Sequence, residues 1–171
     1  MNEQEEIYAI VDEDDRVVGK ATRREIHQKG LLHRSVHIFV FNRAGQLYIQ
    51  KRSMSKDMHP GCWDSSASGH VDFGESYETA AARELEEELG IRARVIYWFK
   101  IRACEETGWE HVAFFTAHAS GEIKANPDEI MEGKFMDIPR LSMWMTHTPK
   151  IFAPGFLLVF KLAMGRGILT R

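Results

Sequence analysis

Residues 69–91 read GHVDFGESYETAAARELEEELGI, and this stretch decides the fold and locates the chemistry. Ser76 is of a type that caps helix N-termini, and Gly90 is of the type that ends helices in the left-handed conformation. The sequence therefore predicts a helix over Tyr77–Leu89. One arc of this helix is apolar, and we expect it to pack against a sheet. The arc contains Ala81, Ala82, Leu85 and Leu89.

The neighbouring arc of the predicted helix is acidic. At about 100° per residue, Glu84, Glu87 and Glu88 lie close together, because residues three and four apart are neighbours on a helix. Like charges at this spacing repel one another, and the last turn of a helix disfavours anions. The pattern indicates that a cation binds here, and a hard divalent ion with oxygen ligands is the simplest candidate.

The same stretch resembles the Nudix box, whose pattern is G-x5-E-x7-R-E-U-x-E-E-x-G-U with U a bulky aliphatic residue. All defined positions are filled, by Gly69, Glu75, Arg83, Glu84, Leu85, Glu87, Glu88, Gly90 and Ile91. The resemblance implies an α/β/α sandwich with a mixed β-sheet between helices. It also implies a hydrolase of diphosphates linked to another moiety, with Mg²⁺ or Mn²⁺ as cofactor. The alternative interpretation is a solvated, glutamate-rich surface helix.

The resemblance assigns roles within the box. It implies that Glu84, Glu87 and Glu88 are metal ligands or bases, with the backbone carbonyl of Gly69 as a further metal ligand. Glu84 is the expected residue for orienting or deprotonating the attacking water, although the base varies in this family. Arg83 belongs with the catalytic group. We expect it to pair with a carboxylate such as Glu75 in preference to substrate.

Segments outside the box resemble isopentenyl-diphosphate isomerases. Five runs carry the likeness: Arg52-Ser53-Met54-Ser55-Lys56, Pro60-Gly61-Cys62-Trp63, Gly69-His70, Asn126-Pro127-Asp128-Glu129-Ile130-Met131 and Phe152-Ala153-Pro154. It implies that Arg52 and Lys56 bind the substrate's diphosphate. It also implies metal binding by His33 and His70, with His27 close to a third such position, but single histidines are more often surface or core residues.

The isomerase resemblance fails at two positions that isomerisation needs. Ser68 corresponds to the cysteine that protonates the double bond, and a serine hydroxyl is a far weaker acid than a thiol. Gly155 corresponds to a carbocation-stabilising tryptophan and offers no aromatic face. Of the isomerase's essential glutamates, Glu110 alone is close to the pattern.

Length and composition fit one domain, residues 1–171, of an ordinary soluble protein. The formal net charge of -3 gives no general field for nucleic acid or membrane. Cys62 and Cys104 offer no disulfide framework, which suits the reducing cytoplasm. Residues 1–6 lack the pattern of a signal peptide. A small-molecule substrate is expected. Met143, Trp144 and Met145 fit either a wall of the substrate cleft or a surface patch that forms a homodimer contact.

Apolar runs separated by turn residues predict the other elements. Strands are expected at 7–11, 17–20, 36–41, 47–50, 94–101, 111–117 and 133–136, and helical segments at 22–28, 139–143 and 154–165. The segment 58–68, with Pro60, Gly61, Ser65 and Ser66, is predicted to be a loop leading into the box.

Three functions compete on the sequence alone. The first is a metal-dependent pyrophosphohydrolase acting on a nucleoside-diphosphate-like substrate. The second is isopentenyl-diphosphate isomerase, suggested by the flanking resemblance. The third is a non-catalytic metabolite-binding module, against which the acidic arc argues, because a binder does not need mutually repelling charges.

Overall fold

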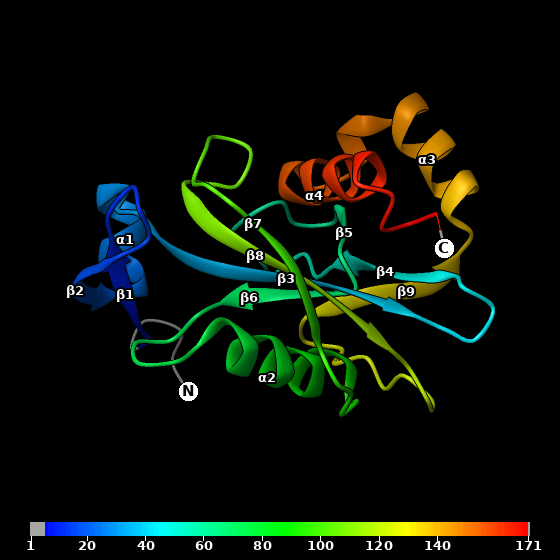
Figure 1. Ribbon diagram of the computed structural model, residues 1–171, viewed down its shortest axis with the longest axis horizontal. Helices are drawn as coiled ribbons and strands as arrows, with labels where there is room; N and C mark the ends of the chain where they lie inside the picture. The colour runs from blue at the N-terminus through cyan, green and yellow to red at the C-terminus, as the bar shows by residue number, and fades with distance from the viewer. Residues whose placement is uncertain (1–5, 171) are drawn as a thin grey trace.

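The computed structural model in Figure 1 describes residues 6–170. Most of the segment 1–6, on which the sequence predicts no signal peptide, therefore lies outside the described residues. The elements are β1 (Ile7–Val11), β2 (Val17–Thr22), α1 (Arg23–Lys29), β3 (His33–Phe41), β4 (Leu47–Arg52), β5 (Trp63–Asp64), β6 (Ala67–His70), α2 (Tyr77–Leu89), β7 (Ile96–Ile101), β8 (Glu110–His118), β9 (Ile130–Met136), α3 (Ile138–His147), the 3-10 turn η2 (Pro149–Ile151) and α4 (Pro154–Gly165). In this described part, no helix has the length and apolar character needed to cross a membrane.

Helices cover both faces of a seven-stranded mixed sheet, as the sequence predicted. Figure 1 shows α2 on one face, α3 and α4 on the other, and α1 with the β1–β2 hairpin at one end. Each face has its own apolar core. Leu85 and Leu89 of α2 pack in the core that contains Val36 and Ile38, whereas Phe156 of α4 packs in the other. The alternating residues of the central strands supply both cores, because successive side chains point to opposite faces.

The sheet divides beside its central strand, β3. This strand runs parallel to β8 along its whole length, from His33↔Glu110 to Phe41↔His118. On its other side it meets β4 at Phe41↔Leu47 and is then paired with β6. Beyond that point β4 pairs with β5 and β9. The two halves diverge there, and this divergence creates room for a cleft.

Helix α2 begins and ends where the sequence predicted. The Ser76 hydroxyl accepts a hydrogen bond from Thr79 N at 3.1 Å, and Gly90 ends the helix with φ 64°. The predicted apolar arc is nearly right, but Ala82 is exposed and Ala80 is buried in its place. The buried face of the helix is therefore shifted slightly from the predicted one, because it also includes the acidic side chains described below.

The prediction of a loop over 58–68 was wrong in its last part, which contains β5 and the start of β6. Serines favoured the loop prediction, yet Ser65 and Ser66 are fully buried. Val40 N donates to Ser66 Oγ at 2.8 Å, so that hydroxyl is satisfied by the neighbouring strand. Small polar residues can occupy a buried link between two strands, as Ser65 and Ser66 do between β5 and β6, when neighbouring strands supply their partners.

The remaining boundaries differ modestly from the predicted ones. Most strands match the predicted positions with ends shifted by one to three residues, and α4 matches at both ends. The largest difference is α3, which runs through Ile138–His147 where only a helical turn at 139–143 was expected. Leu141 and Met145 are buried on this helix, and that packing against the sheet extends it beyond what local propensity indicates.

Candidate active site

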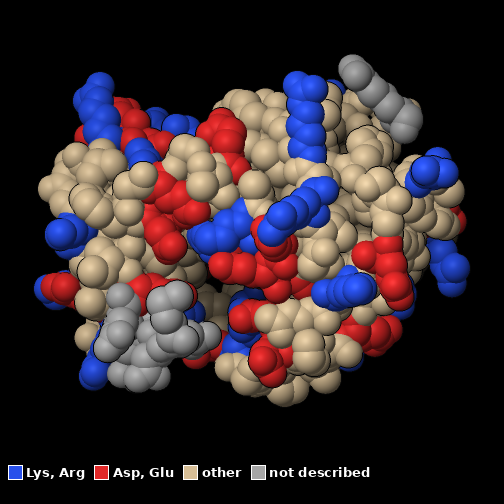
Figure 2. Space-filling view, turned by 90° about the horizontal axis from the view of Figure 1, so that it is seen from below, with Lys and Arg blue, Asp and Glu red and all other residues tan. Residues whose placement is uncertain are grey.

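A cavity of about 430 Å³ lies where the sheet divides. Its walls come from α2, β3, β6, the end of β4, the turn before β9 and the beginning of α4. In the space-filling view of Figure 2, acidic side chains gather near the centre of the face, with basic side chains among them. The predicted metal ligands, Arg83 and the residues predicted to bind diphosphate all line this one cavity. They are Arg52, Lys56, Gly69, Arg83, Glu84, Glu87 and Glu88.

Two glutamates of α2 are buried, although nothing in an ordinary helix would favour this. Glu84 is 8% exposed and Glu88 is 6% exposed. Burial, followed by repulsion from Glu88, raises the pKa of Glu84. Burial also raises the pKa of Glu88, against the effect of a hydrogen bond from Gln50 Nε2 to its Oε2 at 2.5 Å. Both carboxyl groups would therefore ionise more easily beside a cation.

Gly69 faces Glu84 across the boundary between β6 and α2. A Cβ added at Gly69 would lie 2.2 Å from the Cδ atom of Glu84, far inside van der Waals contact. The glycine that begins the box therefore allows the buried carboxylate to approach the backbone of β6. The Gly69 carbonyl as a further metal ligand stays a prediction.

Arg83 organises the acidic cluster. Its Nε and Nη2 donate to the two carboxylate oxygens of Glu75, each at 2.9 Å, which confirms the predicted pair. Its Nη1 donates to Glu84 Oε1 at 2.7 Å and to Glu87 Oε2 at 3.2 Å, and its Nη2 also reaches the carbonyl of His70. Arg83 thus fixes two of the predicted metal ligands. Its predicted place among the catalytic residues stays a prediction.

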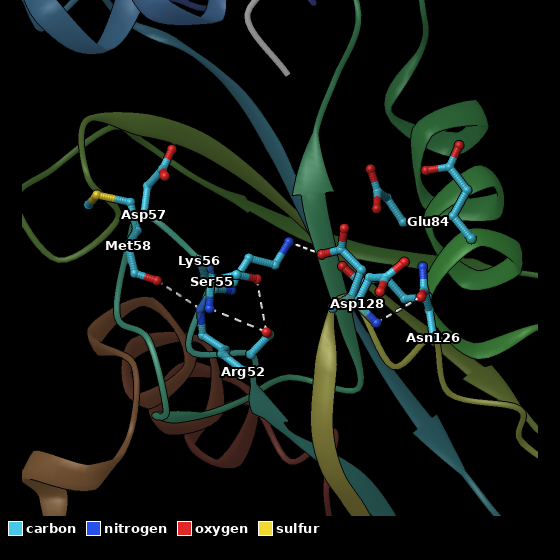
Figure 3. Close-up of polar contacts among 12 residues, drawn as sticks. Arg52, Ser55, Lys56, Asp57, Met58, Glu84, Asn126 and Asp128 are labelled. Atoms are coloured by element: carbon cyan, nitrogen blue, oxygen red, sulfur yellow. Dashed lines mark hydrogen bonds and ion pairs between the residues drawn. The ribbon is translucent and has the colours of Figure 1, made fainter. Parts of the chain in front are cut away.

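The two predicted diphosphate-binding residues are already paired with carboxylates. Arg52 Nη1 donates to Asp64 Oδ2 at 3.0 Å, and its Nε donates to the carbonyl of Met58 at 2.9 Å. Lys56 forms an ion pair with Glu129. Figure 3 shows the Lys56 side chain extending from its loop toward the Asn126–Asp128 segment, with Glu84 across the cleft on α2. The structure brings both cations to the cleft, and their binding of phosphate stays a prediction.

Three histidines from different elements lie close together: His27 on α1, His33 on β3 and His70 on β6. The ring nitrogens of His27, His33 and His70 that could bind a metal lie within 4.8 Å of one another. Glu110 Oε1 lies 2.9 Å from His70 Nε2 and 3.2 Å from His33 Nε2. Tyr8 stacks on His70 with ring centroids 4.7 Å apart. The sequence left the role of these histidines open, and the structure gathers all three.

Charge and burial in this histidine cluster suit a cation. Burial, together with the neighbouring imidazoles, lowers the pKa of His27 to about 4, so its ring is neutral at physiological pH. Burial alone would raise the pKa of Glu110, but His70 and His33 lower it well below its usual value. Imidazole nitrogens and a carboxylate together form a donor set for a divalent transition metal.

Sequence reasoning missed several residues that shape the cleft. Gln50 holds Glu88, Asp64 holds Arg52, and Glu129 holds Lys56. His37 also lines the cavity. A usable signal existed for Gln50 alone, since an amide within the apolar run of a strand indicates a buried polar partner. The acidic partners lie on loops or short strands, where spacing in the sequence gives no indication of contact.

Comparison with known proteins places this site in a family. A family model for the NUDIX domain matches residues 31–154. An uncharacterized Nudix hydrolase of Pseudomonas aeruginosa is 42% identical over 134 residues, which cover 77% of this chain and 78% of that protein. An isopentenyl-diphosphate Delta-isomerase of Serratia proteamaculans is 33% identical over 164 residues, covering 92% and 90%. A crystal structure of a Deinococcus radiodurans protein has a TM-score of 0.73 at 27% identity, covering 83% and 90%.

The chain belongs to the NUDIX family. Membership confirms the superfamily that residues 69–91 predicted, and the similar structures agree with the α/β/α architecture. It supports a Nudix hydrolase in general terms. The residues of this Nudix domain also fit the divalent ion that the sequence implied, because Glu84 and Glu88 are buried carboxylates with raised pKa values.

The raised pKa values predict how Mg²⁺ stabilisation depends on pH. Without metal, the folded protein holds protons on Glu84 and Glu88 above the usual carboxyl pKa of 4.5, where the unfolded chain has lost them. The free energy of unfolding therefore falls as pH rises through this window. Mg²⁺ replaces those protons, so we expect its stabilising shift in Tm to be larger near pH ~8 than near pH ~5.5. A shift independent of pH, or a pH dependence that is undiminished when Glu84 and Glu88 are both replaced by Gln, would contradict this.

The contact between Gly69 and Glu84 predicts that Gly69→Ala weakens Mg²⁺ binding. The new Cβ would displace the Glu84 carboxylate from its position beside β6. We expect a loss of about tenfold in Mg²⁺ affinity, measured by calorimetry. Gly121→Ala is the matched control, because a Cβ at Gly121 meets nothing within 4 Å. Equal affinities in the two variants would show that the close approach has no role.

Proposed function

We propose that this protein is a metal-dependent hydrolase that cleaves the phosphoanhydride bond of a nucleoside-diphosphate-like substrate, with Mg²⁺ or Mn²⁺ as its ion. The single observation that carries the proposal is the burial of Glu84 and Glu88 beside a complete Nudix box. Arg83 pairs with Glu84, and the neutral amide of Gln50 donates to Glu88. Two buried carboxylates compensated in this way are costly unless a cation binds them. Membership of the family supports diphosphate cleavage as the reaction that such an ion assists.

The proposed ion ligands are Glu84, Glu87 and Glu88, with the carbonyl of Gly69. A bound divalent ion neutralises charge on the phosphate oxygens and lowers the pKa of a coordinated water. Glu84 suits the part of proton acceptor, because burial moves its pKa upward toward neutrality. Glu87 is more exposed, at 59% for its side chain, and adds a ligand at the mouth of the cluster.

Arg83 acts in this proposal by positioning carboxylates. Its five donors are taken by Glu75, Glu84, Glu87 and a backbone carbonyl. This arrangement sets the orientation of Glu84 toward the cleft and compensates part of the acidic charge. The side chain has little capacity left for a phosphate oxygen.

Arg52 and Lys56 are the proposed contacts for the diphosphate. Asp64 and Glu129 hold the two cations within the cavity wall. A phosphate oxygen can take the place of a carboxylate oxygen, because both are anionic acceptors of similar geometry. The paired state therefore keeps the two cations oriented until substrate arrives. We propose a small-molecule substrate, no nucleic-acid or membrane partner, and a cytoplasmic location, with a homodimer as the possible assembly.

A hydrolysis screen tests the proposed function. Purified protein with Mg²⁺ or Mn²⁺ is incubated with dinucleotides, nucleotide sugars, oxidised nucleotides, coenzyme A derivatives and isoprenoid diphosphates, and phosphate and monophosphate products are measured. We expect metal-dependent release from at least one class. Glu88→Gln should lower kcat/KM by about 100-fold, because loss of even an outer partner of a metal site costs up to about that much.

Glu86→Gln is the control for that substitution. Glu86 lies on the same helix but is exposed and pairs with Arg92, away from the cleft. We expect its activity to stay within twofold or so of the unmodified protein. The hydrolase would be refuted if no substrate of the panel were cleaved with either metal. It would also be refuted if Glu88→Gln and Glu86→Gln lowered kcat/KM equally.

The histidine cluster favours isomerisation as a second candidate. His27, His33 and His70 meet beside Glu110, and relatives named isopentenyl-diphosphate isomerases match most of this chain. Ser68 lines the same cavity. It stands at the position where the isomerase resemblance has its acidic cysteine, and its hydroxyl is a poor proton donor at neutral pH.

Incubation with isopentenyl diphosphate separates the two candidates. We expect no dimethylallyl diphosphate above the uncatalysed background, because Ser68 lacks the acidity of a thiol. The products are followed by chromatography with Mg²⁺, Mn²⁺ or Zn²⁺ present. Ser68→Cys serves as the matched variant, since it adds the thiol without changing the size of the site greatly. Conversion by the unmodified protein would establish the isomerase.

A further inference from the structure

One end of the cleft takes no part in the proposed metal chemistry. This recess lies between β3, the turn at residues 106–108 and the first turn of α4. Its lining includes Ser35, His37, Glu106, Ala153 and Gly155. A Cβ built on Gly155 would lie 3.5 Å from both His37 Nε2 and the carbonyl oxygen of Glu106, so these three groups surround one space. Gly155 leaves that space open because it carries no side chain.

His37 directs an unused hydrogen-bonding atom into the recess. The side chain is buried, at 9% exposure, and its Nδ1 forms a hydrogen bond of 2.6 Å with Ser65 Oγ. Its Nε2 has no hydrogen-bond partner among residues 6–170. Burial lowers the pKa of His37, so the ring is neutral and Nε2 can donate or accept according to the tautomer. Ser35, two residues earlier on the same face of β3, has a buried hydroxyl that is also unpaired.

The first turn of α4, which includes the cavity-lining Gly155, has backbone N–H groups that the helix itself leaves unpaired. Ala153 is the N-cap residue and supplies no side-chain cap. Pro154 has no N–H, and the N–H groups of Gly155 and Phe156 have no partner within the described part of the chain. Such groups at a helix N-terminus carry partial positive charge and favour an oxygen acceptor. Glu106, which is exposed, is the acidic side chain at the rim of the recess.

We propose that this recess binds an oxygen-bearing substituent, a hydroxyl or carbonyl, on the organic group of the substrate, and that His37 selects it over a hydrocarbon. The substituent receives a hydrogen bond from the first turn of α4 and exchanges one with His37 Nε2. Burying a hydrocarbon there would leave these groups without partners, and a site of that kind rejects analogues that lack the polar atom. This inference rests on the proposed function in one respect, because it assumes that the diphosphate of the substrate binds in the same cleft.

Matched diphosphonates test the recess without turnover. The probes are monoesters of methylene-bridged diphosphonate, which cannot be cleaved between the phosphorus atoms. One pair carries propyl or 3-hydroxypropyl, and the other pair carries pentyl or 5-hydroxypentyl. Dissociation constants are measured by calorimetry with Mg²⁺ present. In at least one pair we expect the hydroxylated member to bind about tenfold more tightly, the effect of one well-made hydrogen bond.

His37→Phe should reduce this preference to less than about twofold, because it keeps the ring and removes both nitrogens. His37→Gln restores a donor and acceptor, and we expect it to recover part of the preference. His118→Phe is the matched control, because His118 is exposed at the end of β8 and does not line the cleft. Gly155→Ala fills the recess at ordinary contact distances and should also remove the preference for the hydroxylated probe. This variant tests the proposal if His37→Phe does not fold.

Equal affinity within both pairs, undetectable binding of all four probes, or a preference that survives both His37→Phe and Gly155→Ala would overturn the proposal. These results are distinct from failure of the hydrolase. A negative hydrolysis screen with an intact hydroxyl preference removes the hydrolase and leaves the recess assigned. Hydrolysis without any hydroxyl preference removes the recess and leaves the hydrolase.

Discussion

The structure depends on holding two carboxylates, Glu84 and Glu88, in the boundary between α2 and the sheet. Removing an ionised carboxylate from water is costly unless charge or hydrogen bonds compensate it. Arg83 contacts Glu84, while the neutral amide of Gln50 is the hydrogen-bond donor to Glu88. Compensation is therefore incomplete within the described chain, and the pKa values of both groups rise. A helix selected for stability alone would place apolar residues at these positions.

This constraint explains features of the surrounding backbone. The strand facing α2 is built from small residues, Ala67, Ser68 and Gly69, and a side chain at Gly69 would collide with Glu84. The sheet also divides next to this strand, which opens the buried carboxylates to the cleft. Arg52 and Lys56 stand on the other half of the sheet or its loop, each held by its own carboxylate. The carboxylates of α2 and the cations Arg52 and Lys56 thus line the same cavity from different elements.

How far the sequence predicts this molecule depends on whether a signal is local. Helix α2 was predicted closely because its cap, its left-handed end and its acidic arc lie within one short stretch. The ion pair of Arg83 with Glu75 was predicted for the same reason. β5 was missed because two residues show no periodicity. The grouping of His27, His33 and His70 was suggested by resemblance alone, since it arises where three elements pack together. The single domain over 1–171 stays a prediction.

The register of β3 determines which groups can act together. His33, Ser35 and His37 lie on one face of this strand. Val36 and Ile38 alternate with them, lie on the other face and fill the core under α2. The ladder sets His33 opposite Glu110 on β8, and it sets Val36 opposite Gly69 and His37 opposite Ser68 on β6. The histidine cluster, the glycine beside Glu84 and the recess at α4 are therefore fixed relative to one another by backbone hydrogen bonds. A slip of one residue would turn His33, Ser35 and His37 toward the core under α2. The apolar packing under α2 therefore holds the site's geometry as well as the fold.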